Sequence, residues 1–313
     1  MVVARFSDDR RITLTVAIHE YSLGQRTLLG VATAARRDAL VGQMIESLRR
    51  VEFVKRIVFR PIDSRRTDPA NSLFDPLRAA LLHHRNGDLD EAMWLVFLAT
   101  HFGRHLRDGW RLLRDVYRGD GAPWTFARVA NNPDAFEAWL GEGYEWLKRD
   151  GIGRRFGNHR KYETLRTDSD RGTSTVLRTY VTWVGPNRGH AGLIADTRDI
   201  SGADPKALFD ELYRSMEAVI SFGRTARFDF LTMVGKLGLT DIEPGIPYLV
   251  GATGPLAGAR LLFANSKTAK LRADDLDNAV ATLGAYLDVG MQVMEDSLCN
   301  WQKSPAQFIA FRG

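Results

Sequence analysis

Cysteine is almost absent from this chain, because Cys299 is the only one among its 313 residues. This excludes an internal disulfide and a zinc or iron–sulfur site built from several thiolates. Long apolar runs are missing too: the N-terminus has none of signal-peptide length, and no segment approaches the ~18 apolar residues of a membrane span. We therefore expect a cytoplasmic protein without a membrane partner.

Several signatures of chemistry are also missing. No His-Asp dipeptide occurs, which disfavours helical phosphohydrolases that place this pair on their metal ions. The stretch Gly251–Arg260 lacks the Gly-Lys-Ser/Thr ending of a phosphate-binding loop, and no strand precedes a dinucleotide fingerprint. His101 and His105 have the i, i+4 spacing of two ligands on one helix face, but no third ligand is evident. We expect no metal and no cofactor, and assign both histidines to helix capping or substrate contact.

What the chain does contain is helical periodicity and a slight excess of positive charge. Lys and Arg outnumber Asp and Glu by 43 to 38, which is compatible with an anionic partner. From Asp38 onward apolar residues recur at helical spacing, so we predict an all-α fold. Residues 13–18 suit either a strand or the buried side of a helix. Further helices are predicted at 105–118, 134–149, 173–184, 205–222, 224–237, 255–265 and 275–299.

Capping residues mark two more helices, which lie before residue 105. Asp75 followed by Pro76 is a helix start with proline at the first helical position, and Asn86-Gly87 ends that helix. Asp88 with Glu91 resembles a capping box, and the segment to Phe102 is apolar on every side. We therefore predict that this second helix lies in the centre of the core and ends at Gly103.

Two glycine-containing turns open helices and could hold an anion. In the first, Gly223 lies between two helical patterns and is followed by Arg224 and Arg227, which together with backbone N–H groups suit a phosphate. In the second, Thr253-Gly254 precedes Pro255, and the free N–H groups of the new helix point at the loop. The alternative for the second turn is a plain helix end and restart.

A polar loop and one charged segment are further candidates. Residues 157–162 combine an amide, an imidazole, two cations and an aromatic ring, which suits contact with phosphates and with a base. The alternative is a solvated basic loop. Arg60 and Asp63 follow an apolar helix end, where a ligand contact and a local ion pair are equally compatible with the sequence.

On these residues the chain resembles the alpha-glutamyl/putrescinyl thymine pyrophosphorylase family, clade 3, a distant relative of the helix-hairpin-helix DNA glycosylases. The resemblance extends from about residue 50 to the end. It is carried by the runs 74–77, 91–97, 101–105, 156–162, 221–231, 251–263 and 295–301. It implies a helix-hairpin-helix glycosylase-like helical domain at 51–313, two-lobed with a central cleft, after an N-terminal helical extension at 1–50.

The resemblance also implies the activity. It points to a DNA-modification enzyme, a hydrolase that cleaves the N-glycosidic bond of a modified or hypermodified pyrimidine, for instance in phage DNA as an anti-phage defence. One alternative is a pyrophosphorylase acting on a hypermodified thymine nucleotide, and another is a DNA-binding protein without catalysis. The expected partner is DNA, modified in phage or host, or a modified nucleotide.

Comparison with glycosylases places Asp229 one turn into the helix after Gly223, where a carboxylate can accept a base N–H or stabilise an oxocarbenium-like sugar. Its alternative is a structural ion pair with Arg224 or Arg227. We predict Asp229 and His159 as catalytic, while other registers favour the carboxylates of Asp241, Glu243, Asp274 or Asp275. Phe156, Tyr162 and Phe228 are candidates for stacking on the base. The predicted substrate-binding residues are Arg60, Arg104, Asn158, Arg160, Lys161, Tyr162, Arg224, Arg227, Thr253, Gly254 and Arg260.

Overall fold

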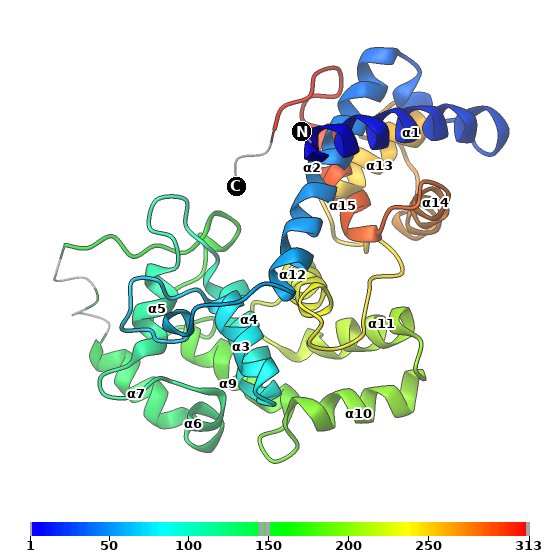
Figure 1. Ribbon diagram of the computed structural model, residues 1–313. Coiled ribbons are helices and arrows are strands. Elements are labelled where there is room, and N and C mark those ends of the chain that lie inside the picture. The colour runs from blue at the N-terminus through cyan, green and yellow to red at the C-terminus, as the bar shows by residue number, and fades with distance from the viewer. Residues whose placement is uncertain (1, 144–146, 148–150, 311–313) are drawn as a thin grey trace. The chain divides into compact units, whose positions relative to one another are not determined.

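Helices form both parts of this chain. The computed structural model describes residues 2–143, 147 and 151–310, with side chains from Asp8 onward apart from that of Asn158. Within these residues there are helices, loops and two isolated bridges but no β-strand, so the predicted all-α class is confirmed (Figure 1). None of the helices in the described part is long and apolar enough to cross a membrane.

The chain divides into two compact units. We call Met1–Arg56 together with Pro244–Arg312 the terminal unit, and Ile57–Glu243 the central unit. The central unit is thus inserted, in sequence, between two halves of the terminal unit.

The terminal unit has one hydrophobic core built from both ends of the chain. Its elements are α1 (Val2–Gly24), η1 (Leu29–Val31), α2 (Ala34–Val58, whose last residues extend into the central unit), α13 (Gly254–Ala264), α14 (Ala273–Tyr286) and α15 (Met291–Trp301). Leu14 and Ile18 of α1 are fully buried in the same cluster as Leu283 and Trp301. Residues 13–18 are therefore helical, with their apolar side inward.

The predicted single helix over 275–299 is wrong, because the structure has two helices there. α14 ends at Tyr286, and α15 begins at Met291. Between them Asp288 adopts a positive φ of 51°, which a continuous helix does not allow. Gly290 then caps α15.

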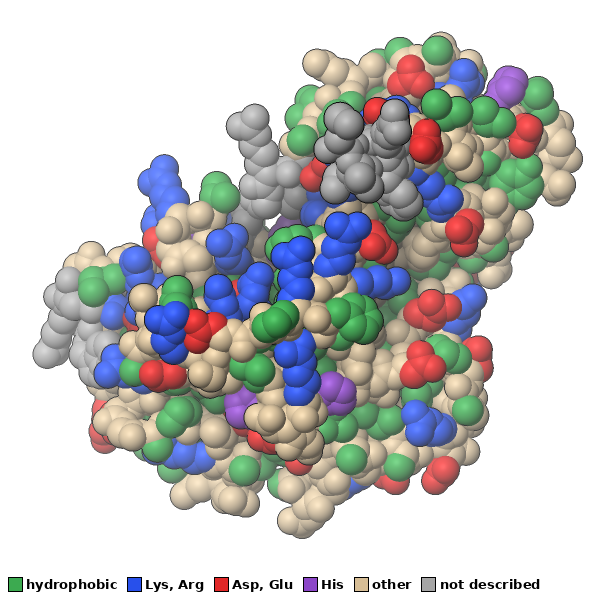
Figure 2. All heavy atoms as spheres, in the orientation of Figure 1, with side chains coloured by type: hydrophobic (Ala, Val, Ile, Leu, Met, Phe, Trp, Pro, Cys, Tyr) green, Lys and Arg blue, Asp and Glu red, His purple; other side chains and the backbone are tan. Residues whose placement is uncertain are grey.

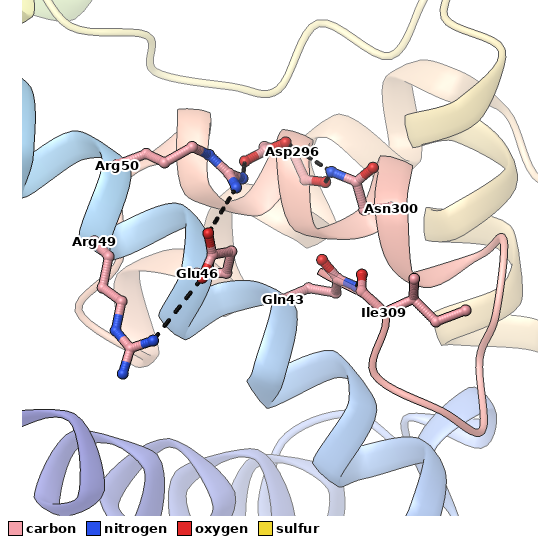
Figure 3. A network of polar contacts seen from close by, with 7 residues as sticks. All are labelled: Gln43, Glu46, Arg49, Arg50, Asp296, Asn300 and Ile309. Carbon is pink, nitrogen blue, oxygen red and sulfur yellow. Dashed lines mark hydrogen bonds and ion pairs between the residues drawn. The ribbon is translucent and has the colours of Figure 1, made fainter. Parts of the chain in front are cut away.

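A polar network joins α2 to α15 inside the terminal unit (Figure 3). Arg50 pairs with Glu46 at 3.4 Å and with Asp296 of α15, and Asn300 donates to the Asp296 carboxylate at 2.9 Å. Gln43 donates to the backbone oxygen of Ile309 at 2.9 Å, so the segment after α15 lies along α2. These contacts fix the two ends of the chain to each other.

The central unit is organised around one buried helix. Its elements are η2 (Ser64–Arg66), α3 (Pro76–Arg85), α4 (Leu89–Phe102), α5 (Arg111–Arg118), α6 (Phe126–Asn131), α7 (Pro133–Gly143), η3 (Asn158–Arg160), α9 (Thr173–Val184), α10 (Gly189–Ser201), α11 (Pro205–Ser215), η4 (Met216–Ala218) and α12 (Arg224–Lys236). α4 is buried on nearly every side, which confirms its predicted central position. The ring of Phe97 stacks on Tyr180 of α9 and on Phe222 before α12, with centroids 3.6 and 4.8 Å apart.

The predicted starts of α3 and α4 are confirmed, but only the Asp88 half of the capping box forms at α4, because both Glu91 oxygens accept from Tyr117 and Phe126 instead. The Asp75 side chain accepts from the backbone of the first turn of α3, with Pro76 at the first position, and the Asp88 side chain accepts from Glu91 N at 3.1 Å. Gly103, with a φ of 64°, ends α4. Asparagine and aspartate oxygens satisfy the free N–H groups of a helix start, which is why these short motifs predict boundaries well.

Other predicted helices differ from the structure. The one expected at 105–118 starts only at Arg111, because the residues before it form a hairpin. The one expected at 205–222 ends at Ser215 and is followed by η4. α10 was not predicted at all. α7 occupies the first part of the expected 134–149 helix, and most of the remainder lies outside the described residues.

Glu91 of α4 is a buried carboxylate at the centre of this unit. One of its oxygens accepts from the Tyr117 hydroxyl at 2.5 Å and the other from Phe126 N at 2.8 Å. Burial raises the pKa of Glu91 to about 7, although both hydrogen bonds oppose the shift. In the unfolded chain the same group has an ordinary pKa near 4.5. The folded state therefore binds this proton more tightly than the unfolded state does.

We expect the Glu91→Gln variant to lose part of the pH dependence of stability. The stabilising contribution of Glu91 to the free energy of unfolding is fully present below pH 4.5 and is lost as the pH rises through about 7. For wild type this lowers the free energy of unfolding by about 2–3 kcal/mol between roughly pH 5 and pH 7.5. Urea unfolding at both pH values measures it. Exposed Glu142→Gln is the control, and an equal pH dependence in wild type and Glu91→Gln would contradict the expectation.

Candidate functional site

The start of α12 forms one side of the site. The turn before it contains Ser221 with a positive φ of 62°, and Gly223 is the residue directly before the helix. The predicted glycine turn and the helix that follows it are thus present. Phe228 and Phe230 of α12 are buried, whereas Asp229 between them is exposed to solvent. The helical period therefore directs this carboxylate away from the core.

The loop after Phe156 forms the other side, and two glycines hold it in place. Gly157 N donates to Phe102 O at 2.8 Å, directly before Gly103 at the end of α4. A Cβ on Gly157 would lie 2.8 Å from the carbonyl carbon of Gly103, so only glycine permits this approach. Two of the runs that carry the family resemblance, 101–105 and 156–162, therefore meet backbone to backbone.

Arg160 lies inside the protein, contrary to the surface contact with phosphate predicted for it. It is 8% exposed, its Nε donates to Thr100 O at 2.9 Å, and its guanidinium carbon lies 5.6 Å from the Phe222 ring centroid. Its Nη2 is buried without a hydrogen-bond partner. Burial lowers the pKa of Arg160, and Asp229 is the largest influence in the opposite direction. The Arg160 guanidinium is thus shielded from solvent, and the charge of Asp229 helps to keep it ionised there.

Asp229 combines accessibility with poor hydration. Its side chain is exposed, yet the protein atoms crowded around the carboxylate desolvate it and raise its pKa above the ordinary value. The charges of Arg160 and His159 oppose this shift most strongly. Within the described residues the carboxylate makes no hydrogen bond or ion pair. A carboxylate with a shifted pKa and no hydrogen bond or ion pair among the described residues is a candidate catalytic group.

A second carboxylate, Glu163, lies beside this site and was missed by the sequence analysis. Half-buried, it has its pKa raised by burial, with Arg160 and a hydrogen bond to the Ser221 side chain opposing the shift. Arg171 donates to the same Ser221 hydroxyl at 3.4 Å. The only sequence signal was position, since Glu163 follows directly on the polar loop 157–162.

The two histidines of the i, i+4 pair do not form a metal site. His101 is buried, and its Nε2 lies 3.1 Å from the Thr173 hydroxyl. That hydroxyl donates to Thr164 O, so His101 is the donor to it. Burial lowers the pKa of His101 to about 3, which leaves it neutral. His105 lies in the hairpin instead, and the described residues include no group of three metal-binding side chains.

Of the remaining predicted residues in the central unit, some suit ligand contact and others serve the fold. Tyr162 is 88% exposed, with the Lys161 ammonium 5.0 Å from its ring centroid, and His159 and Arg104 are exposed as well. Arg227 donates to Tyr213 O at 3.1 Å and lies over the Tyr213 ring, so it is engaged at the end of α11.

Arg224 is half-buried over the ring of Phe228 and contributes positive charge at Asp229. Phe228 is only 1% exposed, which does not fit the stacking role predicted for it. Phe156 stacks on Phe102. Arg60 is exposed near the end of α2, and its backbone oxygen accepts from Arg85. The side chain of Asn158 lies outside the described part.

The second glycine turn belongs to the terminal unit, where its glycines serve helix packing. A Cβ on Gly254 would lie 2.8 Å from Cys299 Sγ, and one on Gly258 would lie 2.3 Å from Leu298 O, so α13 packs closely on α15. Arg260 donates to Leu271 O. Thr253 is exposed.

The other candidate carboxylates lie on the surface. Asp241 is exposed, and Glu243 lies 3.7 Å from the Lys206 ammonium. Asp274 and Asp275 are exposed in the first turn of α14 in the terminal unit, where Asp274 pairs with Arg272. Glu243 and Asp274 have cations of their own beside them, whereas Asp229 lies within the influence of Arg160 and has a raised pKa, so Asp229 is the strongest candidate among the five.

The helical fold and this group of residues define a class of protein. Asp229 lies within the electrostatic influence of His159, Arg160 and Arg224, where a helix start meets a polar loop, and a carboxylate with a shifted pKa among cations is a candidate functional site. The chain belongs to the alpha-glutamyl/putrescinyl thymine pyrophosphorylase family, clade 3, whose family model matches residues 35–313. It is therefore an enzyme of modified-thymine chemistry. No curated protein and no solved structure matches the chain.

Proposed function

We propose that this protein is a cytoplasmic DNA glycosylase that hydrolyses the N-glycosidic bond of a modified or hypermodified pyrimidine, with phage DNA as its target in defence. The observation that carries the proposal is Asp229, an accessible carboxylate with a raised pKa and no structural partner among the described residues. A helix-hairpin-helix glycosylase-like arrangement, with a cleft for the extruded base, is part of the same proposal.

The chemistry follows from the position of Asp229. When the glycosidic bond breaks, its electron pair leaves with the base, and positive charge develops on the sugar. The Asp229 carboxylate stabilises that charge and takes the proton of the water whose oxygen bonds to the anomeric carbon. Buried Arg160 favours the ionised form of the carboxylate and so opposes the rise in pKa that its poor hydration causes. His159 is exposed beside it and is suited to protonate the departing base.

The direct test is base release from DNA. The full-length protein is incubated with oligonucleotide duplexes that differ only in one pyrimidine, either unmodified or hypermodified, and alkali then cleaves any abasic site. We expect strand breaks in the modified duplex alone. Tight binding without breaks in either duplex would contradict the proposal and favour a DNA-binding protein without catalysis.

A second candidate function is supported by the description of the family, which names a pyrophosphorylase. The side chains of His159, Lys161 and Arg224 would then hold the phosphates of a hypermodified thymine nucleotide. Such chemistry ordinarily needs Mg²⁺, whereas hydrolysis of a glycosidic bond does not. Turnover of the nucleotide that stops with a chelator would favour this candidate, and base release that continues in the chelator would favour the glycosylase.

Lys161, unlike its buried neighbour Arg160, is expected to contact a phosphate of the DNA. Lys161 is exposed beside Tyr162, so Lys161→Gln removes one phosphate contact and lowers the slope of log affinity against log salt by about 0.9. Fluorescence anisotropy over a series of salt concentrations measures this slope. Exposed Lys270→Gln in the terminal unit loses the same charge and is the control. Equal slopes for Lys161→Gln and wild type would contradict a DNA contact of this loop.

A further inference from the structure

Residues His105–Gly109, which the sequence analysis assigned to a helix, form a short hairpin next to the candidate site. His105 N donates to Gly109 O at 3.0 Å and Gly109 N to His105 O at 2.9 Å, so the two ends of the turn are closed on each other. The His105 Nδ1 lies 3.3 Å from Arg107 N and 3.2 Å from Asp108 N inside the turn. The hairpin is therefore held by its own backbone and by one side chain.

The hairpin is also fixed to the loop of the candidate site. Arg155 donates to both carboxylate oxygens of Asp108 at 2.8 and 3.0 Å, and the Asp108 side chain is only 7% exposed. Gly103, two residues before the hairpin, is in backbone contact with Gly157. The position of the hairpin relative to the loop 157–162 is thus set by contacts at two points.

At its tip this hairpin presents an apolar side chain to solvent. Leu106 is 74% exposed, and Arg104 and Arg107 on either side of it are exposed too. A single exposed leucine on a surface is ordinary. This one differs because a braced turn holds it out between two cations, and Arg155, directly before the loop of the candidate site, is bonded to that turn. Figure 2 shows further Lys and Arg side chains gathered where Figure 1 draws the loops beside α3, α4 and α5.

We infer that Leu106 is a wedge that enters the base stack of duplex DNA beside the target nucleotide, while Arg104 and Arg107 contact the phosphates on either side. An apolar side chain between cations matches a duplex, which offers an apolar stack between two rows of phosphates. The inference rests on the proposed function, because base extrusion needs the stack to open. It adds to that function a residue that opens the duplex without touching the reacting bond.

The test uses full-length protein and a duplex with 2-aminopurine next to the modified pyrimidine, since the fluorescence of this base rises when it unstacks. We expect wild type to raise the fluorescence and Leu106→Ala to lose most of the rise, with duplex affinity in low salt falling about twofold or less. Base release from the paired duplex should slow about 10- to 100-fold. Release from an oligonucleotide whose target base is already unpaired should change by less than about twofold.

Two variants accompany Leu106→Ala. Leu23→Ala removes a leucine of similar exposure, 77%, in α1 and should behave as wild type. Leu106→Met keeps an apolar side chain of similar size and should restore the fluorescence rise, and thermal unfolding of Leu106→Ala at the wild-type temperature excludes misfolding as the cause of its loss. A fluorescence rise of wild-type size in Leu106→Ala would overturn the inference.

The outcome separates this inference from the proposed function. Unstacking that depends on Leu106, without base release from any DNA, supports the wedge and ends the glycosylase proposal. Base release from paired duplex at the same rate with and without Leu106 ends the wedge and leaves the glycosylase. If wild type neither binds nor unstacks duplex DNA, the wedge is overturned.

Discussion

Turnover falls by about 10²- to 10⁴-fold when Asp229 is replaced by asparagine, if the carboxylate stabilises the developing sugar cation and accepts the proton of water. The amide has the same size but neither charge nor basicity. Because no hydrogen bond or ion pair of the Asp229 carboxylate exists among the described residues, the fold loses only the favourable influence of this charge on the buried Arg160 cation. DNA affinity is expected to stay equal or to rise slightly, since a negative charge near phosphate has been removed.

Single-turnover rates, thermal unfolding and DNA binding by anisotropy measure the three quantities. The matched control is Asp241→Asn, an exposed aspartate five residues after α12 and one of the alternative catalytic carboxylates. Its rate should equal that of wild type. A fully active Asp229→Asn together with an inactive Asp241→Asn would move the catalytic role to Asp241.

The pH profile of wild type gives an independent check on Asp229. Because its ionised form is the active one and its pKa is raised, the fall in rate on the acid side should lie above the range of an ordinary aspartate. An acid limb in the ordinary range would argue that Asp229 is not the group that titrates.

The second large effect is expected for Gly157→Ala. A Cβ there would lie 2.8 Å from the carbonyl carbon of Gly103 and 2.9 Å from Arg104 N, and these backbone atoms can only move apart. The φ of Gly157 is −60°, which alanine adopts freely, so the whole effect is steric. Separation of the loops would break the bond from Gly157 N to Phe102 O and displace Arg160 from Asp229.

We expect turnover of Gly157→Ala to fall about 100-fold, because a displacement near 1 Å is enough for such a loss. Overpacking should also lower the free energy of unfolding by about 1–3 kcal/mol. Single-turnover kinetics and urea unfolding measure the two effects. Gly121→Ala is the control, since nothing lies within 4 Å of a Cβ at Gly121. A Gly157→Ala protein with wild-type rate would show that the contact between the two loops does not position the site.

The sequence predicted those parts of the fold that depend on neighbouring residues. Asp75-Pro76 and Asp88 mark helix starts because one side-chain oxygen satisfies the backbone a few residues on. The break between α14 and α15 was missed, because the apolar stripe continues through it and the positive φ of Asp288 has no clear signature. The hairpin His105–Gly109 was missed for a related reason. The two residues that its backbone hydrogen bonds join are four apart, which is also the spacing of a helical hydrogen bond.

The candidate site was predicted in its local pieces but not in its assembly. The glycine turn at 223 and the loop 157–162 were each identified by composition. That Arg160 lies inside while neighbouring Lys161 is outside depends on Thr100 and Phe222, which are distant in sequence. Glu163 was missed because its significance comes from Arg160 and Ser221, and no spacing rule connects the three.

The insertion of the central unit between the two halves of the terminal unit determines the order in which the protein can be completed on the ribosome. Ile57–Glu243 is continuous, so this part has its whole core once Glu243 has emerged. Leu14 and Ile18 of α1 must wait for Leu283 and Trp301, which are made after the central unit. α1 is therefore made before the central unit but buried after it, and a ribosome that stalls near residue 250 leaves its apolar face open to chaperones and proteases.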